Sequence, residues 1–363
     1  MSEIWDELDQ LLDSRERVAM ATLVATRGTT PKKEGAKMWV GEGGRILGSV
    51  TIGGCVDARV IEEAEEILAA GSAKRIAMSL SDEEAWDFGM SCAGTVEVLI
   101  EPVALGEPSD PVVQAYARVR ESVAAGRHAI VVSRLDSDSA RLVIVERQGR
   151  SGTLGSTDLD AAAVAAAEGV IARGSSRTIE LQLGESTIEL FFELHGPTAR
   201  LLVFGATTVA IPLVELARTL GFRTVVVDAR PRFASAERFP NAGEIRIGNP
   251  AEIAMELPLG PTTCVVLLAH DYKYDVPILR EVLQHDVAYL GLLGSRGRGR
   301  AILDFLREEG VPEEQLQRIH VPVGLDIGAQ SAPEIALSIL AEAVAVRSGR
   351  GGGKMRARPA PGA

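Results

Sequence analysis

Two cysteines stand in glycine-rich segments and offer thiolate chemistry. Cys55 follows Thr51–Gly54 and immediately precedes a predicted helix, whose dipole favours the thiolate form. Cys92 lies within Phe88–Gly94, just before a predicted strand. Thiolates in such loops suit soft metals, sulfur transfer or redox chemistry. The alternative is that both are small residues packed in tight turns, because free cysteine is commonly a core residue.

The third cysteine and one arginine complete this part of the sequence. Cys264 lies inside an apolar strand and is expected in the core. No two cysteines form a C-x-x-C pair, so a disulfide framework is not expected, and a reducing cytoplasm is the simpler interpretation. Arg27 stands in the polar turn after the first predicted strand and offers a contact to an anion.

A dinucleotide-type turn is predicted in the C-terminal half. Gly205 begins the turn after the strand Arg200–Phe204, and backbone N–H groups at such a turn attract pyrophosphate. Asp228 closes the next strand, at the spacing at which an acid commonly binds a ribose hydroxyl. Thr207 occupies a position where the motif has glycine, and its Cβ would obstruct the pyrophosphate. An ordinary strand–helix turn is therefore the alternative interpretation.

A histidine and an aspartate follow the next buried strand. His270 and Asp271 come directly after Thr263–Ala269. They are candidates for a proton-handling pair. The alternative is that the histidine caps the following helix while the acid is solvated. Since parallel strands end at one edge of a sheet, both are expected where open α/β sheets bind ligands.

A glycine-flanked serine and arginine follow the strand Val287–Leu292. Ser295 adds a hydrogen-bond donor, and Arg296 offers a fork for phosphate or carboxylate. Arg298 and Arg300 are expected on a solvated helix face. The three loops converge on one edge, which makes an anionic small molecule the expected ligand there.

The elements that position these residues after Pro197 alternate between strand and helix. This order predicts a Rossmann-like, doubly wound parallel sheet covered on both faces. Ser331 and Glu334 form a capping box that begins a final helix running to Val346. Further strands are predicted at Arg223–Val227 and Glu244–Ile247, and helices at Ala210–Leu220, Ala251–Glu256, Val276–Gln284 and Arg298–Glu309.

The first part of the chain predicts a mixed α/β domain over residues 1–196. It begins with an amphipathic helix near Ile4–Leu12, and Gly196-Pro197 is the boundary. The Rossmann-like domain then covers 197–346, and the glycine- and arginine-rich residues 347–363 are expected to be a disordered basic tail. Strands are predicted at Val18–Thr26, Lys37–Val40, Arg45–Val50, Arg75–Leu80, Thr95–Val103, Ala129–Ser133, Arg141–Glu146 and Thr187–Leu194, and helices at Val56–Ala70, Val112–Ala125 and Leu159–Ala172.

Composition excludes several functional classes. The chain has 363 residues with 46% hydrophobic and 24% charged residues, which is typical of a globular protein of two domains. Its 38 basic and 50 acidic residues give a net charge of −12, which disfavours nucleic-acid binding. No apolar run has the roughly 20 residues of a membrane span, and Met1–Asp13 does not resemble a signal peptide.

Taken together, these segments resemble the XdhC/CoxI family, the maturation factors of molybdenum hydroxylases such as xanthine dehydrogenase and carbon monoxide dehydrogenase. The chain departs from the family pattern in having Thr207-Thr208 where members commonly have Gly-His, and Ala93 where they often have glycine. The segments that carry the resemblance are Ala25–Pro31, Gly48–Val56, Cys92–Pro102, Val226–Pro231, Arg238–Ala242, His270–Asp275, Gly291–Arg296, Pro322–Ala329 and Pro333–Ala336.

The resemblance implies a chaperone rather than a turnover enzyme. Such a protein binds molybdenum cofactor, protects it while a sulfur is installed, and delivers it to a molybdenum hydroxylase apo-enzyme. Cys55 and Cys92 are then the candidates on the metal side, and Asp228, Ser295 and Arg296 those on the phosphate side. A cysteine desulfurase is an open second partner, and a homodimer is compatible with the apolar-rich chain.

Two other functions remain open from the sequence. An NAD(P)-dependent oxidoreductase would use the Gly205 turn and Asp228, with His270 as a base. A scaffold would dock an apo-enzyme through its acidic body or basic tail without touching a cofactor.

Overall fold

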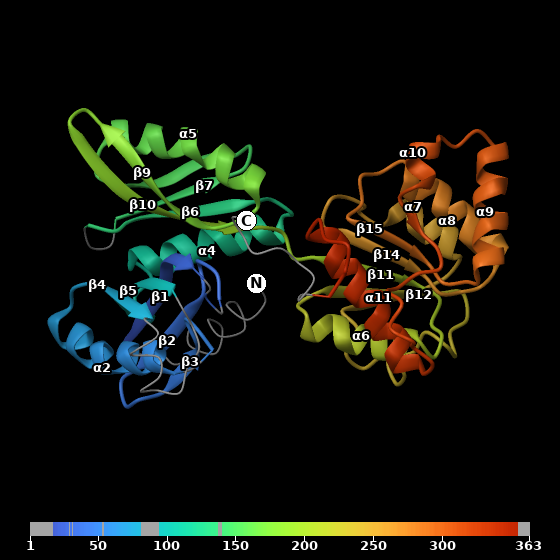
Figure 1. Cartoon of the computed structure of the whole chain (residues 1–363), viewed down its shortest axis with the longest axis horizontal. Coiled ribbons are helices and arrows are strands. Elements are labelled where there is room, and N and C mark those ends of the chain that lie inside the picture. Colours follow the sequence, from blue (N-terminus) through green and yellow to red (C-terminus); the bar gives the residue numbers. More distant parts are fainter. Residues whose placement is uncertain are drawn as a thin grey trace. The chain divides into compact units, whose positions relative to one another are not determined.

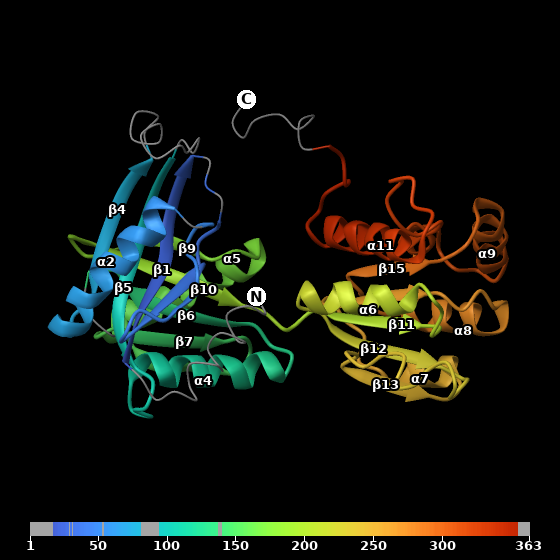
Figure 2. The same cartoon turned by 90° about the horizontal axis from the view of Figure 1, so that it is seen from below.

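The computed structural model describes residues 17–28, 30, 32–52, 54–80, 94–136 and 140–354. The chain divides into two compact units, Met1–Pro197 and Thr198–Ala363 (Figures 1 and 2). Across the described ranges, no helix is both long and apolar enough to cross a membrane. The helix predicted near Ile4–Leu12 lies outside the described residues.

The second unit contains the predicted parallel sheet. Its strand order is β13-β12-β11-β14-β15-β16, which is the doubly wound order with the switch point between β11 and β14. The fold class predicted from the sequence is therefore confirmed. The strands are β11 (Arg200–Phe204), β12 (Arg223–Asp228), β13 (Glu244–Ile247), β14 (Thr263–Leu267), β15 (Tyr289–Leu292) and β16 (Ile319–His320).

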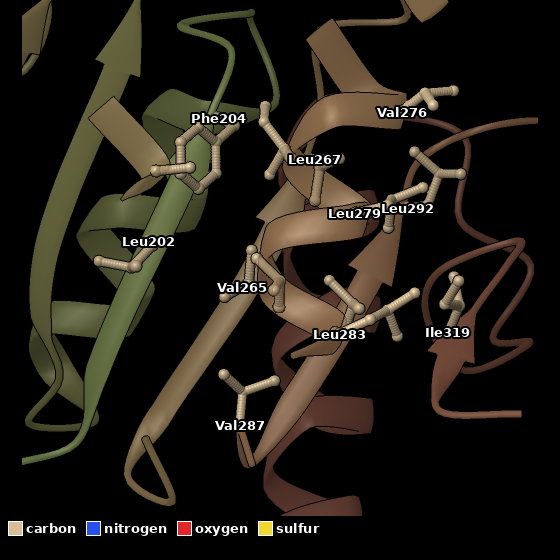
Figure 3. Close-up of a cluster of buried hydrophobic side chains, with 14 of the residues drawn as sticks. Leu202, Phe204, Val265, Leu267, Val276, Leu279, Leu283, Val287, Leu292 and Ile319 are labelled. Carbon is tan, nitrogen blue, oxygen red and sulfur yellow. The ribbon is translucent and has the colours of Figure 1, made fainter. Parts of the chain in front are cut away.

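Helices cover both faces of this sheet. Alternate residues of each strand point to opposite faces, and both sets are apolar, so each face is buried under helices. Leu202 and Val265 pack with α7, α8, α9 and α10, and Figure 3 shows part of this cluster. Leu201 and Cys264 pack on the other face with α6 and α11. The predicted capping box is present, with Ser331 and Glu334 at the start of α11. The helices are α6 (Ala210–Thr219), α7 (Pro250–Glu256), α8 (Tyr272–Leu283), α9 (Arg296–Glu308), α10 (Glu313–Leu316) and α11 (Ala332–Arg347).

The first unit contains two antiparallel sheets. One has the order β3-β2-β1-β5-β4 and the other β8-β7-β6-β10-β9. The sequence pattern does not predict β8 or β9; β8 is exposed along its whole length and has no apolar pattern. The strands are β1 (Arg17–Gly28), β2 (Lys37–Gly41), β3 (Ile46–Gly48), β4 (Lys74–Leu80), β5 (Gly94–Ala104), β6 (Ala129–Arg134), β7 (Arg141–Val145), β8 (Gly149–Thr153), β9 (Arg177–Leu183) and β10 (Ser186–His195).

The helices of this unit alternate with its sheets. Helix α2 (Cys55–Ala70) covers the outer face of the first sheet, and α5 (Thr157–Arg173) covers the outer face of the second. Helix α4 (Pro111–Ala124) packs against the inner faces of both sheets through Val112 and Val119. The inner faces are therefore buried, and polar residues on them must find partners.

Such polar residues form a buried network between the two sheets. Lys37 Nζ donates to Thr22 Oγ1 at 2.8 Å and lies 3.1 Å from Glu193 Oε2. Tyr116 on α4 donates to the same carboxylate, and His195 Nε2 lies 3.2 Å from its other oxygen. The network therefore joins β1 and β2 to β10 and to the helix between them.

Burial and charge oppose each other in this network. Burial lowers the pKa of Lys37, and attraction to Glu193 offsets this only in part. The pKa of Glu193 is lowered to about 2. Burial alone would raise this pKa, but attraction of the carboxylate to Lys37 and His195 outweighs the effect of burial. Arg141 pairs with Glu101 beside them, so each buried carboxylate has a cation.

This shift predicts an acid dependence of stability. The folded pKa of Glu193 lies below the value of about 4.3 for a glutamate in an unfolded chain. The ionised carboxylate therefore makes its full contribution to the free energy of unfolding above about pH 4.3, and this contribution is lost as the pH falls toward 2. The difference in unfolding free energy between the parent and Glu193→Gln should therefore narrow between about pH 4 and pH 2. Urea unfolding of both proteins at several pH values measures this difference. A difference that stays constant with pH would contradict the lowered pKa of Glu193.

Candidate functional site

Cys55 is the first residue of α2 and carries a free, half-buried thiol. Gly54 precedes it with φ 107°, a left-handed conformation that favours glycine, and no side chain caps the helix. Backbone N–H groups of a first helical turn lack intrahelical partners, so the start of α2 offers unpaired donors beside the thiol. Part of the Cys55 side chain packs on the core beneath α2.

The loop before Cys55 is fixed by Asp57. This carboxylate, which is 6% exposed, accepts from Ser49 Oγ at 2.6 Å and from the Val50 and Thr51 amides at 3.1 and 3.3 Å. Thr51 Oγ1 is buried and has no hydrogen-bond partner within the described part of the chain. The Cys55 thiol therefore follows a segment that Asp57 holds in place and that carries the unpaired Thr51 hydroxyl.

Cys92 and its segment 81–93 lie outside the described residues, so its predicted role stays a prediction. Gly94, two positions later, pairs with Leu80 on one side and with Gly28 on the other. Lys32, just after β1, donates to the Ser49 carbonyl at 2.9 Å. The end of β1, the start of β5 and the loop before α2 thus belong to the same part of the first sheet.

Arg27 is exposed at the end of β1, opposite Thr95.

Over the described ranges, no three His, Cys, Asp or Glu side chains gather as a metal site. A soft metal at Cys55 would therefore need a further ligand from the undescribed segments or from the bound molecule itself.

In the second unit, the turns after β11 and β14 are in close backbone contact at the switch point. Gly205 has φ 110°, and a Cβ there would lie 2.7 Å from the Ala269 amide nitrogen. Its amide donates to the Val227 carbonyl at 2.8 Å, which anchors the turn to β12. The turns after β11 and β14 therefore touch through backbone atoms, and glycine is required by this geometry.

Asp228 faces the same turn. It is 4% exposed and accepts from the Ala206 amide at 2.8 Å and from the amide, Nε and Nη2 of Arg230 at 2.8–2.9 Å. Burial raises the pKa of Asp228, but these donors outweigh it and lower the pKa. Since a carboxylate has about four acceptor sites, a ribose hydroxyl would have to displace one of these bonds.

His270 and Asp271 are both exposed at the carboxyl edge. Asp271 is the N-cap of α8 and accepts from the Lys273 amide at 3.0 Å. His270 has φ 55°, a left-handed conformation that is uncommon for a residue with a Cβ. The aspartate rather than the histidine therefore caps the helix, and the proton-handling pair stays a prediction.

The arginines of α9 differ from the expectation. Ser295 is the N-cap and accepts from the Arg298 amide at 3.2 Å, while Arg296 is exposed. Arg298 does not lie on a solvated face: its side chain is 16% exposed and Nη2 lies 2.6 Å from Asp275 Oδ2. The expectation for Arg298 was wrong because its side chain turns toward α8, whereas Arg300 is exposed as predicted.

Comparison with known proteins places both units in one family. Residues 201–343 match the family described as XdhC Rossmann domain, and residues 11–78 match the XdhC and CoxI family. A protein of Bacillus subtilis named as a probable xanthine dehydrogenase subunit is 28% identical over 94% of this chain and 96% of its own length. "Molybdenum cofactor insertion chaperone PaoD" of Escherichia coli is 26% identical over 93% and 86%.

A solved structure supports the same assignment. The crystal structure of a xanthine dehydrogenase from Bacillus halodurans is 29% identical, with a TM-score of 0.77 over 99% of this chain and 98% of that chain. The match extends over both units. Among the family segments quoted from the sequence, Gly48–Val56 includes the Cys55 loop, and Val226–Pro231, His270–Asp275 and Gly291–Arg296 lie at the carboxyl ends of β12, β14 and β15. The chain belongs to the XdhC and CoxI family.

Proposed function

We propose that this protein is a maturation factor that binds molybdenum cofactor and delivers its sulfurated form to a molybdenum hydroxylase apo-enzyme in the cytoplasm. The relative named as a molybdenum cofactor insertion chaperone supports the role. The relative named for xanthine dehydrogenase supports the kind of partner. A cysteine desulfurase as sulfur donor and a homodimeric assembly belong to the same proposal.

The observation that carries the proposal is the placement of Cys55. Its half-buried thiol stands at the start of a 16-residue helix, behind a loop fixed by Asp57. Molybdenum cofactor is an anionic pterin phosphate with a metal that prefers sulfur ligands, so a thiolate suits its metal side. Cys55 and Cys92 would bind the metal, and Arg27 would contact an anionic group.

Cys55→Ala is expected to lower the amount of molybdenum cofactor retained by the purified protein at least tenfold. The reason is that no other cysteine of the described residues is accessible: Cys264 is fully buried, and burial raises its pKa to about 11. Retained cofactor is measured as bound molybdenum and as the fluorescence of the released, oxidised pterin. Cys92→Ala is expected to have the same effect.

Cys264→Ala is the matched control. It removes a thiol from the core of β14, so cofactor retention should stay at the parent level. Retention by Cys55→Ala equal to that of Cys264→Ala would overturn the thiol role.

A further inference from the structure

Three buried polar atoms of the second unit lack a hydrogen-bond partner among its described residues. They are Thr207 Oγ1, Asp275 Oδ1 and Arg298 Nε. These residues follow β11, β14 and β15, the strands at and beside the switch point. Buried polar groups are nearly always paired in folded proteins, and open α/β sheets bind ligands at this edge. The unpaired N–H of Arg298 is a donor, so its position points to a bound acceptor at this edge.

Arg298 is the group among these that can reach a ligand. Its guanidinium is held from two sides, by Asp275 Oδ2 at 2.6 Å and by the Tyr272 ring, whose centroid lies 4.2 Å from Cζ. Asp275 is fully buried, whereas 16% of the Arg298 side chain remains exposed. The aspartate can therefore orient the guanidinium but cannot itself meet a solvent-borne molecule.

This arrangement resembles the one across the switch point. Arg230 is fixed in the same way by buried Asp228 and stacks on Phe233, with 3.9 Å between Cζ and the ring centroid. A pre-oriented guanidinium loses little side-chain entropy on binding and presents a planar fork that fits an oxyanion. Arg296, favoured from the sequence, is exposed and has no such support in the described structure.

We propose that Arg298 binds an oxyanion, phosphate or carboxylate, of a small molecule at the carboxyl edge of the second-unit sheet, with Asp275 and Tyr272 as positioning residues. The inference goes beyond the proposed function, because it concerns residues of the other unit and does not depend on which molecule carries the anion. The α9 N-terminus beside Arg298 adds backbone N–H groups of the right polarity.

The test is calorimetric titration of the full chain, free of molybdenum cofactor, with inorganic pyrophosphate and separately with citrate. Saturable binding of one probe is expected and distinguishes phosphate from carboxylate. Arg298→Ala should raise the dissociation constant of that probe at least tenfold. Arg298→Lys should not restore it, since an ammonium lacks the planar fork. Arg300→Ala, an exposed arginine of the same helix, should leave it unchanged.

The positioning role of Asp275 has its own readout. Asp275→Asn should weaken binding in the parent but cause no further loss in the Arg298→Ala background, which a purely structural defect would not reproduce. If Arg298→Ala unfolds the unit, Arg298→Gln keeps a donor toward Asp275 and replaces it in the series.

Three outcomes would overturn the proposal: no binding of either probe, equal affinity in the folded Arg298 variants, or an equal loss in Arg300→Ala. Because the titration contains no molybdenum cofactor, its result is separate from the Cys55 experiment. Either can fail while the other stands.

Discussion

Glu193→Ala is expected to lower the free energy of unfolding of the first unit by about 3–5 kcal/mol. The substitution leaves the Lys37 ammonium, whose side chain is 1% exposed, without its carboxylate. It also removes the hydrogen bond that the buried Tyr116 hydroxyl donates to Glu193. Tryptophan fluorescence during urea unfolding follows this unit alone, because Trp5, Trp39 and Trp86 all precede Pro197.

Two further variants separate the buried charge from other effects. Adding Lys37→Met to Glu193→Ala should recover part of the loss, since it removes the unpaired ammonium. Glu62→Ala breaks an exposed pair with Arg59, whose side chains are 68% and 51% exposed, and should cost less than about 1 kcal/mol. A Glu193→Ala loss no larger than that of Glu62→Ala would show that the network does not hold the sheets together.

The second unit was predictable from its sequence because parallel strands are buried on both faces. Such strands appear as unbroken apolar runs, as in Leu201–Phe204 and Cys264–Leu268, and the helices between them have a clear apolar face. The order of strands and helices then leaves few topologies. The observed order confirms the doubly wound prediction.

The layered arrangement of the first unit was not predictable in the same way. Lys37, Glu101 and Glu193 are charged residues within strands that are otherwise mostly apolar, and charged side chains are usually exposed to solvent. In the structure they face the other sheet and are 4–5% exposed. A sequence pattern separates polar from apolar positions, but it does not say whether the polar face meets water or a second layer.

The arginines of α9 show why the carboxyl-edge residues were only partly predicted. The sequence placed Ser295 and Arg296 near the edge and Arg298 on a solvated helix face; in the structure Ser295 is the N-cap of α9, and both arginines lie in its first turn. Which arginine turns inward depends on Asp275 from a different helix, 2.6 Å from Arg298. Spacing along one element carries no information about such a partner. A second aspartate one turn after the N-cap Asp271 was the available signal.

Gly205→Ala is expected to destabilise the second unit by about 2–5 kcal/mol, from left-handed strain together with a backbone clash. The residue has φ 110°, and the added Cβ would lie 2.7 Å from the Ala269 amide nitrogen and 2.9 Å from the Leu268 carbonyl carbon. Relief by a rotamer change is not available, because these are backbone atoms. The turn cannot simply retreat either, since the Phe204 carbonyl accepts from the Leu268 amide at 2.7 Å.

Hydrogen exchange of the β11 and β14 amides measures this loss, because all tryptophans lie in the other unit. Gly310→Ala is the matched control: its φ is 88°, and nothing lies within 4 Å of an added Cβ. It should therefore show the conformational strain alone, about 1 kcal/mol. The excess loss in Gly205→Ala is then the cost of separating the two turns at the switch point. An excess near zero would mean that Ala269 yields easily, and glycine would be needed there only for its backbone conformation.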